Sequence, residues 1–372
     1  MSGENPPVKS RCGLDANRAE VICHAWSTHG QHLAAYCSDR KIYVWNSVNC
    51  EQEKIFDTPP NITGISWSPE DDQIAAVSQD GYIFIWKIAW TIDSVTLRAQ
   101  INTDAKRIIS VYWTPDSQCL NIASVGKNID GEYLALQRWD IKTKELLSSK
   151  IDRVWDKAYP AVSSQQRFLG LALQEGLVQV WDIQTIKLIG TFDRDYAKLY
   201  SLAYSLDGKT VALGWDNGWI DVWSLENEST KKITTLSELN KLAVFSLSFS
   251  KSGNLLASRS FDEHILLWNC ADWSVVADLP SSCSQSNQVE LAFQPFGSRI
   301  VMPKSQDQIL EIWDVDEDVL LNNQMGYRIT IDGNGNIVMI GNQNSVENTS
   351  TVIKSDGFQS SPESASPSRP AF

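Results

Sequence analysis

Residues 199–224 read LYSLAYSLDGKTVALGWDNGWIDVWS, and this stretch decides the fold because it holds one complete structural unit. Its apolar residues predict three short strands, at Tyr200–Tyr204, Thr210–Leu213 and Trp219–Trp223. The joints Leu-Asp-Gly and Asp-Asn-Gly are turn sequences, because their glycine accepts the positive φ that tight hairpins need. The stretch therefore predicts a three-stranded antiparallel meander.

The same unit recurs along the chain, and each copy ends in an apolar strand that finishes on tryptophan. The intervals between these tryptophans are 41, 53, 42, 42, 45 and 45 residues, which is the period of a four-stranded propeller blade. We therefore predict an all-β fold, a seven-bladed β-propeller of four-stranded antiparallel blades. The seven repeat tryptophans are Trp45, Trp86, Trp139, Trp181, Trp223, Trp268 and Trp313.

The repeats divide the chain into three predicted parts. Residues 1–18 are polar and form either a flexible lead-in or a strand that closes the ring, and residues 19–340 form the propeller. Residues 341–372 are rich in Ser, Asn and Pro, and they have too few large apolar residues to offset the entropy of ordering. We expect them to be a disordered tail or a linker, with Ser361-Pro362 and Ser366-Pro367 as candidate phosphorylation sites.

Three segments depart from the regular repeat. The insertion at residues 126–131 lengthens the interval before Trp139 and predicts a loop. The outer strand of the seventh unit is expected near Asp318–Asn322. The segment 327–340 predicts a hairpin, which is either an incomplete extra unit or a pair of strands that lock the ring.

Charge and cysteine usage exclude several classes of protein. The 32 Lys and Arg against 45 Asp and Glu give a formal net charge of −13, which repels nucleic acid and anionic membranes. The seven cysteines are scattered, with no C-x-x-C pair, so we expect thiols in a reducing compartment rather than disulfides or a zinc site. No apolar run approaches 18 residues, and the N-terminus lacks a signal-peptide core. A soluble, cytoplasmic protein is predicted.

The repeat resembles that of WD-repeat (WD40) proteins over roughly residues 20 to 320. The resemblance is carried by ITGISWSPEDDQIAAVSQDGYIFIWK at 62–87, by VFSLSFSKSGNLLASRSFDEHILLWN at 244–269, and by literal Trp-Asp pairs at 139–140, 181–182 and 313–314. The Gly-His dipeptide of the family is missing from all seven units. The resemblance therefore implies that the family's Asp-His-Ser/Thr-Trp network does not form in its usual version, and that strand packing supplies more of the stability.

An acidic residue stands six positions before the tryptophan in most units. A catalytic or calcium-binding ring is one interpretation of these carboxylates. The better one is structural, because Asp and Asn in tight turns bond their own backbone. The residues are Asp39, Asp80, Asp262 and Asp307, with Glu175 and Asn217 at the equivalent positions of two other units.

No constellation for catalysis is found in the sequence. His24, His29 and His32 lie within nine residues, but no further His or Cys motif completes a metal-ligand set. Nucleophile elbows, Cys-His pairs and glycine-rich phosphate loops are absent from the sequence. We predict no enzyme activity, no metal and no cofactor.

Aromatic residues near the turns between the second and third strands predict a partner-binding rim. Two tryptophans in one six-residue turn are costly to leave in water, so they either contact a partner or pack on adjacent blades. The candidate rim residues are Trp215, Asp216, Trp219, Tyr82, Tyr133, Arg259 and Phe261. Trp155 and Trp273 lie in segments between strands, and the same two interpretations apply to them, with packing favoured.

The predicted function is a non-enzymatic scaffold that binds a protein or peptide partner through this rim. The alternatives are a sensor or regulatory domain of a larger protein and, from another class, a propeller enzyme acting at the central channel. Neither the identity of the partner nor the oligomeric state follows from the sequence.

Overall fold

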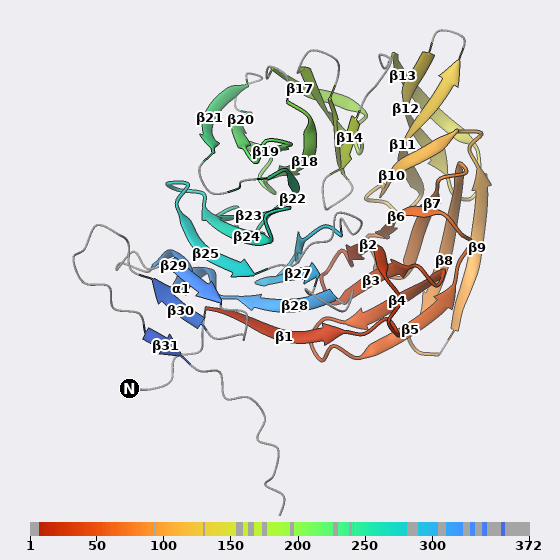
Figure 1. Ribbon diagram of the computed structural model, residues 1–372. Coiled ribbons are helices and arrows are strands. Elements are labelled where there is room, and N and C mark those ends of the chain that lie inside the picture. The colour runs from red at the N-terminus through yellow and green to blue at the C-terminus, as the bar shows by residue number, and fades with distance from the viewer. Residues whose placement is uncertain are drawn as a thin grey trace, which may run out of the picture.

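Seven antiparallel sheets surround a central axis in the computed structural model (Figure 1). The structure describes residues 7–92, 94–128, 131–153, 159–162, 167–172, 177–193, 197–225, 230–237, 240, 242–280, 289–303, 310–322, 328–331, 337–340 and 351–353. First strands of neighbouring blades contact each other around the axis. The predicted seven-bladed propeller of four-stranded antiparallel blades is confirmed.

Each blade is a meander whose strands we call a to d from the axis outward. The first three blades are β2 (Val21–Trp26), β3 (His32–Cys37), β4 (Lys41–Asn46) and β5 (Gln52–Asp57); β6 (Ile62–Trp67), β7 (Gln73–Ser78), β8 (Tyr82–Ala89) and β9 (Ser94–Asn102); β10 (Arg107–Trp113), β11 (Cys119–Asn128), β12 (Gly131–Asp140) and β13 (Leu146–Arg153).

The next three blades follow the same order. They are β14 (Tyr159–Val162), β15 (Phe168–Ala172), β16 (Leu177–Asp182) and β17 (Lys187–Asp193); β18 (Leu199–Tyr204), β19 (Thr210–Trp215), β20 (Ile220–Ser224) and β21 (Lys231–Leu236); β22 (Val244–Phe249), β23 (Leu255–Ser260), β24 (His264–Asn269) and β25 (Val275–Pro280). We call the side with the a–b and c–d turns the AB face, and the opposite side, with the b–c turns, the BC face.

The a–b turns share one hydrogen bond that the sequence encodes. A Ser or Thr directly after strand a accepts the backbone N–H five residues later, at distances of 2.9 to 3.2 Å. This bond satisfies an amide at the start of strand b and fixes the turn. The accepting residues are Ser27, Ser68, Thr114, Ser205 and Ser250.

Near its other end, strand a carries a β-bulge in five blades. The register shifts at Ile22, Thr63, Ile109, Tyr200 and Phe245, each of which is the extra residue between two consecutive pairs of the ladder. A bulge re-aims the side chain of the extra residue and interrupts the ladder. These five residues therefore form a ring of equivalent positions toward the BC face.

Blade 7 is closed by the N-terminus. It consists of β26 (Ala292–Phe293), β27 (Arg299–Pro303), β28 (Leu310–Val315) and, as strand d, β1 (Val8–Leu14), which pairs antiparallel with β28. Of the two alternatives for residues 1–18, the structure has the closing strand.

The outer strand expected near Asp318–Asn322 is wrong. Helix α1 (Glu317–Leu321) occupies that segment, capped by the Asp316 side chain, which accepts the N–H of Val319. The sequence Asp-Glu-Asp before an apolar pair suits a helix N-terminus. With the edge of β28 already taken by β1, no place in the blade is left for a strand there.

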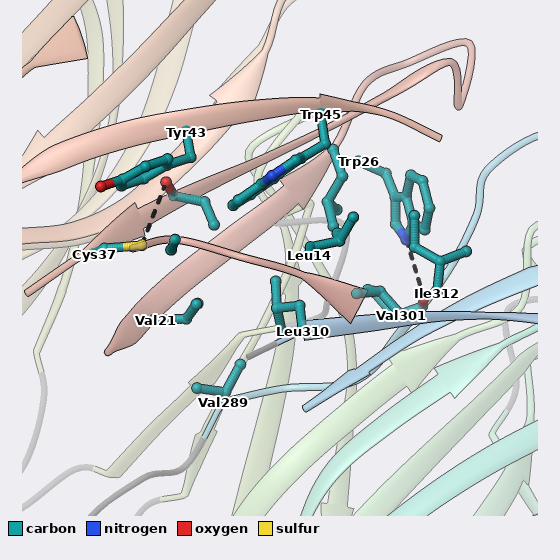
Figure 2. Close-up of a cluster of buried hydrophobic side chains, with 14 residues drawn as sticks. Leu14, Val21, Trp26, Cys37, Tyr43, Trp45, Val289, Val301, Leu310 and Ile312 are labelled. Atoms are coloured by element: carbon teal, nitrogen blue, oxygen red, sulfur yellow. Dashed lines mark hydrogen bonds between the residues drawn. The ribbon is translucent and has the colours of Figure 1, made fainter. Parts of the chain in front are cut away.

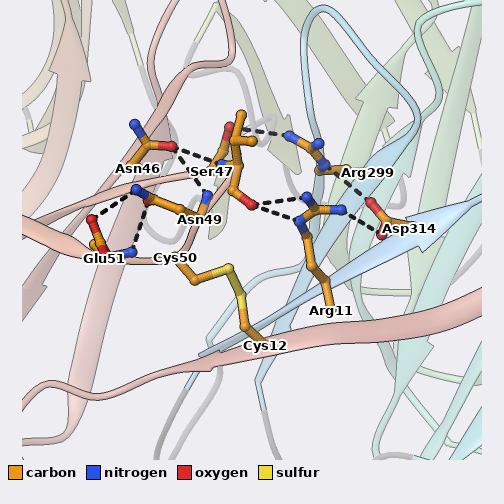
Figure 3. Close-up of a disulfide and its surroundings, with 10 residues drawn as sticks. Arg11, Cys12, Asn46, Ser47, Asn49, Cys50, Glu51, Arg299 and Asp314 are labelled. Carbon is orange, nitrogen blue, oxygen red and sulfur yellow. Dashed lines mark hydrogen bonds and ion pairs between the residues drawn. A yellow bond between two sulfur atoms is a disulfide. The ribbon is translucent and has the colours of Figure 1, made fainter.

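A disulfide joins the closing strand to blade 1, which corrects the expectation that all seven cysteines are thiols. Cys12 of β1 is bonded to Cys50 in the β4–β5 turn, 38 residues away in sequence (Figure 3). Arg11 supports the same junction, since it donates to the Val48 carbonyl at 2.8 and 2.9 Å and pairs with Asp314 at 2.8 Å. The two cysteines are far apart in the sequence and belong to no recognisable motif, so the sequence did not indicate that they pair.

The core continues across the closed seam. Leu14 of β1, Trp26 and Trp45 of blade 1, and Val301 and Ile312 of blade 7 belong to one buried cluster (Figure 2). This cluster takes residues from the N-terminus, the first blade and the last blade. This part of the core is therefore complete only when the ring is closed.

Three further strands follow the ring. β29 (Arg328–Ile331) pairs parallel with β25, and β30 (Ile337–Ile340) and β31 (Thr351–Ile353) extend the sheet of blade 6. The predicted hairpin thus neither adds a blade nor locks the seam. Apart from β31, which the predicted disorder of 341–372 did not foresee, that tail lies outside the described residues. The division of the chain at residues 19 and 340 stays a prediction.

The insertion in blade 3 is built differently from the expected loop. β11 and β12 pair without interruption from Cys119–Asp140 to Asn128–Gly131, so most of the insertion lengthens a hairpin. No described helix is long and apolar enough to cross a membrane.

Candidate partner-binding face

The BC face of blades 5 and 6 carries the exposed aromatic residues that the sequence placed on a rim. The β19–β20 turn presents Trp219, which is 40% exposed, and its backbone N–H donates to the Asn217 side chain at 3.2 Å. Gly218 has φ +85°, and a Cβ there would lie 2.3 Å from the Asn240 carbonyl oxygen. Only glycine fits this close approach, which holds the turn against the chain that leads into blade 6.

The segment that leads into blade 6, residues 240–243, contacts the b–c turns of both blades. Leu242 is 51% exposed, and its carbonyl lies beside Gly218. The next residue, Ala243, accepts the backbone N–H of Phe261 at 3.2 Å. Trp219, Leu242 and Phe261 are therefore carried by segments that contact one another.

Two residues at the bulges complete an aromatic group. The Phe261 ring lies 4.6 Å from the Phe245 ring and 6.4 Å from the Tyr200 ring, the latter edge-on. Tyr200 is 39% exposed, whereas Phe245 is buried. We call Tyr200, Trp219, Leu242, Phe245 and Phe261 the blade 5–6 aromatic cluster.

Arg259 supports this cluster from below. Its side chain is 1% exposed, its guanidinium carbon lies 5.0 Å from the centre of the Phe245 ring, and Nη1 donates to the Val289 carbonyl at 2.6 Å. A cation against a ring face is attractive, and more so away from water. Arg259 was predicted as a surface contact, and that part of the prediction is wrong: its role is to fix the aromatic residue above it.

Trp215 is also buried, which corrects its place in the predicted rim. It is 1% exposed and lies in one core cluster with Val211 and Leu213. These residues alternate along β19, which runs two residues further than the predicted Leu213 and so turns Trp215 inward. The alternative interpretation, packing within the ring, holds for Trp215. Asp216 is half-buried, and its backbone N–H donates to the Lys198 carbonyl.

Tyr82 and Tyr133 do not join the cluster. Tyr82 is half-buried, and its ring stacks 6.1 Å from Phe84 within its own blade. Tyr133 lies across the β11–β12 hairpin from Gly126, where a Cβ would be 2.2 Å from its ring. Of the predicted rim, Trp219 and Phe261 lie on turns that both contact the segment 240–243, and Tyr200, Leu242 and Phe245 were missed. A comparison of the repeats could have identified Tyr200 and Phe245, because both occupy the same position of the repeat, where the bulge lies.

Two of the carboxylates before the repeat tryptophans, Asp39 and Asp262, bond the backbone of their own turns, as expected, whereas the bond found for Asp80 is to the Asn61 side chain. Asp39 accepts the Lys41 N–H at 3.2 Å and the Tyr43 hydroxyl at 2.8 Å, and Asp262 accepts the His264 N–H at 3.3 Å. Asp80 accepts from Asn61 at 3.3 Å. Asp307 and Glu175 lie outside the described residues, as does Trp155.

The repeat tryptophans are core residues. Trp45, Trp86, Trp139, Trp181 and Trp268 are at most 8% exposed, and Trp223 and Trp313 are half-buried. Trp268 donates to the Ser258 hydroxyl at 2.8 Å, while Nε1 of Trp139 and Trp223 has no hydrogen-bond partner among the described residues. Trp273, also half-buried, packs against the blade 5–6 core.

The three neighbouring histidines have separate partners. His24 Nε2 lies 2.7 Å from the Glu290 carbonyl oxygen, His29 pairs with Asp71 at 3.1 Å, and His32 pairs with Glu53 at 2.9 Å. Within the described part of the chain, no three His, Cys, Asp or Glu residues gather as metal ligands.

Burial shifts the pKa of three titratable groups in the direction that favours their neutral form. Burial raises the pKa of the Cys23 thiol to about 12, with a smaller contribution from Glu290, and desolvation raises the pKa of the Glu290 carboxyl to about 7. Burial likewise raises the pKa of Cys270 to about 12. A thiol with so high a pKa is a poor nucleophile at neutral pH.

Comparisons with known proteins agree with this geometry. The family model for the WD domain, G-beta repeat, matches residues 8–46, 50–87 and 231–269. WD repeat-containing protein SL1-17 of Schistosoma mansoni is 28% identical over 199 residues, which cover 54% of this chain and 62% of that protein. The WD repeat-containing protein 26 homolog of Arabidopsis thaliana is 21% identical over 311 residues, which cover 82% of this chain and 50% of that protein.

A solved structure shows the same fold. The β-propeller domain of Myceliophteria thermophila Cps50 (Swd1) superposes with a TM-score of 0.64 at 14% identity, covering 83% of this chain and all of that domain. The chain spans only about half to three-fifths of the length of the two sequence relatives.

Proposed function

We propose that this chain, which belongs to the WD40-repeat family of β-propellers, is a non-enzymatic scaffold that holds a protein partner on the blade 5–6 aromatic cluster. WD40 propellers are in general protein-interaction scaffolds or regulators. The observation that carries the proposal is the cluster itself: Tyr200, Trp219 and Leu242 are each 39 to 51% exposed. The Tyr200 ring lies beside Phe261, and the segments that carry Trp219, Leu242 and Phe261 contact one another.

The chemistry of the cluster suits a protein partner. Exposed aromatic side chains, with few rotatable bonds, are the residues that most often dominate binding free energy at interfaces. The cluster is fixed before binding by Gly218, by the Ala243–Phe261 hydrogen bond and by buried Arg259. A pre-ordered surface loses little entropy when a partner docks.

Affinity capture from native extract, followed by mass spectrometry, tests the proposal. We expect Trp219→Ala and Phe261→Ala to weaken recovery of the captured partner at least tenfold, which is about 1.4 kcal/mol. Trp90→Ala is the matched control, because Trp90 is 38% exposed but lies on the AB face, where its Nε1 donates to the Asp71 carbonyl. Capture that is equal for all three folded variants would contradict the proposal.

Two further predictions remain proposals. A role as the regulatory part of a larger protein is compatible with the same surface. The prediction of a cytoplasmic protein rested in part on free thiols. The cysteines no longer support it, because Cys12 and Cys50 form a disulfide.

A further inference from the structure

The AB face holds a cavity that the scaffold function does not use. It measures about 490 Å³, which is within the range of pockets that bind small ligands or peptide side chains. Blades 1, 2, 3, 4, 5 and 7 line it, so it lies over the axis at the end opposite the aromatic cluster. Its walls include Trp26, Trp67, Phe168, Tyr204, Phe293 and Phe296.

The strand register relates several walls of the cavity to one position of the repeat. Six inner strands place an aromatic residue at that position, paired with the second residue of strand b, which is aliphatic in each case. These six residues are Trp26, Trp67, Trp113, Tyr204, Phe249 and Phe293. In blade 4 the same register position, opposite Leu169, is Val162. The collar, as we call these rings, therefore has no ring from blade 4 at this position, and blade 4 lines the cavity with Phe168, the neighbour of Leu169.

The polar atoms of these rings already form hydrogen bonds within the protein. Trp26 Nε1 donates to the Ala292 carbonyl at 3.0 Å (Figure 2), Trp67 Nε1 donates to the Ala25 carbonyl at 3.1 Å, and the Tyr204 hydroxyl donates to the Gly208 carbonyl at 2.8 Å. Each wall thus presents a ring face or edge rather than a donor. Such walls favour an apolar, flat group.

Three charged side chains line the cavity, and two of them, Arg167 and Asp182, form an ion pair. The third, Asp207, is held in its own turn, where it accepts from the Ser205 hydroxyl at 2.6 Å and from the Lys209 N–H at 3.0 Å. Arg167 donates from Nε and Nη2 to the Asp182 carboxylate at 3.3 and 3.0 Å, and its guanidinium lies 4.9 Å from the Phe168 ring centre. A formally charged ligand gains little from such a pair. The Tyr112 hydroxyl has no hydrogen-bond partner among the described residues, so it is available to a peptide carbonyl.

The lip of the cavity is apolar and exposed. Leu206, in the a–b turn of blade 5, is 62% exposed, and Phe296, in that of blade 7, is 52% exposed. We propose that this cavity is a second binding site, which takes an aromatic side chain of a peptide segment as the missing ring of the collar. The segment's backbone carbonyl accepts from Tyr112.

Titration of the full chain with three probes, followed by saturation-transfer NMR, tests this site. The probes are N-acetyltryptophanamide, N-acetylleucinamide and N-acetyllysinamide. We expect the tryptophan probe to bind saturably and at least fivefold more tightly than the leucine probe, and the lysine probe not to bind. Equal response to all three, or no saturable binding, would overturn the proposal.

Variants locate the binding. Leu206→Ser with Phe296→Ser should weaken the tryptophan probe about tenfold, while Leu147→Ser, at a residue of β13 that is 54% exposed, should leave it unchanged. Val162→Trp supplies the seventh ring from the chain itself and should abolish binding. If Val162→Trp does not fold, the variant Leu206→Ser with Phe296→Ser tests the site instead. Unchanged binding of the tryptophan probe to that variant would refute the site. Trp219→Ala should have no effect, so this test is separate from that of the scaffold function.

Discussion

Trp215 and Trp219 lie four residues apart and have opposite roles. The sequence showed that one turn carries both, but not that β19 extends to Trp215, and this extension sets which tryptophan is buried. The alternation of Val211, Leu213 and Trp215 contained that answer, because residues two apart face the same side of a strand. The roles of Asp39 and Asp262, in contrast, followed from turn chemistry alone.

Alanine at these two positions should separate stability from binding. Trp215→Ala leaves a cavity in the core and should lower the free energy of unfolding by about 3–5 kcal/mol. Trp219→Ala removes a side chain that is 40% exposed, so it should cost much less stability. Urea denaturation of both variants measures this, and equal losses would show that the assignment of the two residues is wrong.

His24 predicts a pH dependence of stability. Burial lowers its pKa below the ordinary value of 6.5, and Nδ1 has no described hydrogen-bond partner, so a proton there would be buried and unpaired. The unfolded state then binds more protons, and stability is lost as pH falls below about 6.5. Glu290 acts in the opposite direction, since its raised pKa makes stability fall as pH rises from about 4.5 to about 7.

A His24→Gln variant isolates the histidine contribution from that of Glu290. Glutamine can still donate to the Glu290 carbonyl, but it does not titrate. The difference in unfolding free energy, wild type minus His24→Gln, should decrease between pH 7.5 and pH 5. A constant difference over that range would mean that His24 keeps its ordinary pKa in the folded protein.

At the scale of elements, strands a to c of most blades could be predicted, whereas the closing strand was only one of two alternatives for residues 1–18. Apolar alternation and turn residues are local signals, so β18, β19 and β20 were placed within two residues of their observed ends. The pairing of β1 with β28 depends on the ring bringing the two ends of the chain together. Nothing within residues 8–14 specifies that partner. The outer strand of blade 7 was therefore expected directly after β28, where the structure has helix α1.

The disulfide should make ring closure sensitive to reductant. Crosslinking residues 38 apart removes about 4 kcal/mol of loop entropy from the unfolded state. Reduction, or Cys12→Ser with Cys50→Ser, should therefore lower the unfolding free energy by about that amount. The double variant serves as the control, since reductant should not change its stability further; an effect of the same size in that variant would point to another cause.

At the scale of the whole molecule, the ring presents two different faces. The BC face has the blade 5–6 aromatic cluster, whose Trp219 and Phe261 were predicted, while Tyr200 and Phe245 depend on a bulge that only the register reveals. The AB face has the aromatic cavity, and blade 4 has a valine at the position where the other six blades have an aromatic residue. Both result from comparing equivalent positions among blades, which requires the strand register as well as the repeat.

Hydroxyl-radical footprinting of the chain, free and bound to its captured partner, tests the central claim most directly, because aromatic side chains react readily and report their own exposure. The account predicts that binding protects Tyr200, Trp219 and Phe261 while Trp90 on the AB face reacts as before. Protection of Trp90 with Trp219 unchanged would contradict the claim that this protein binds its partner through the blade 5–6 aromatic cluster.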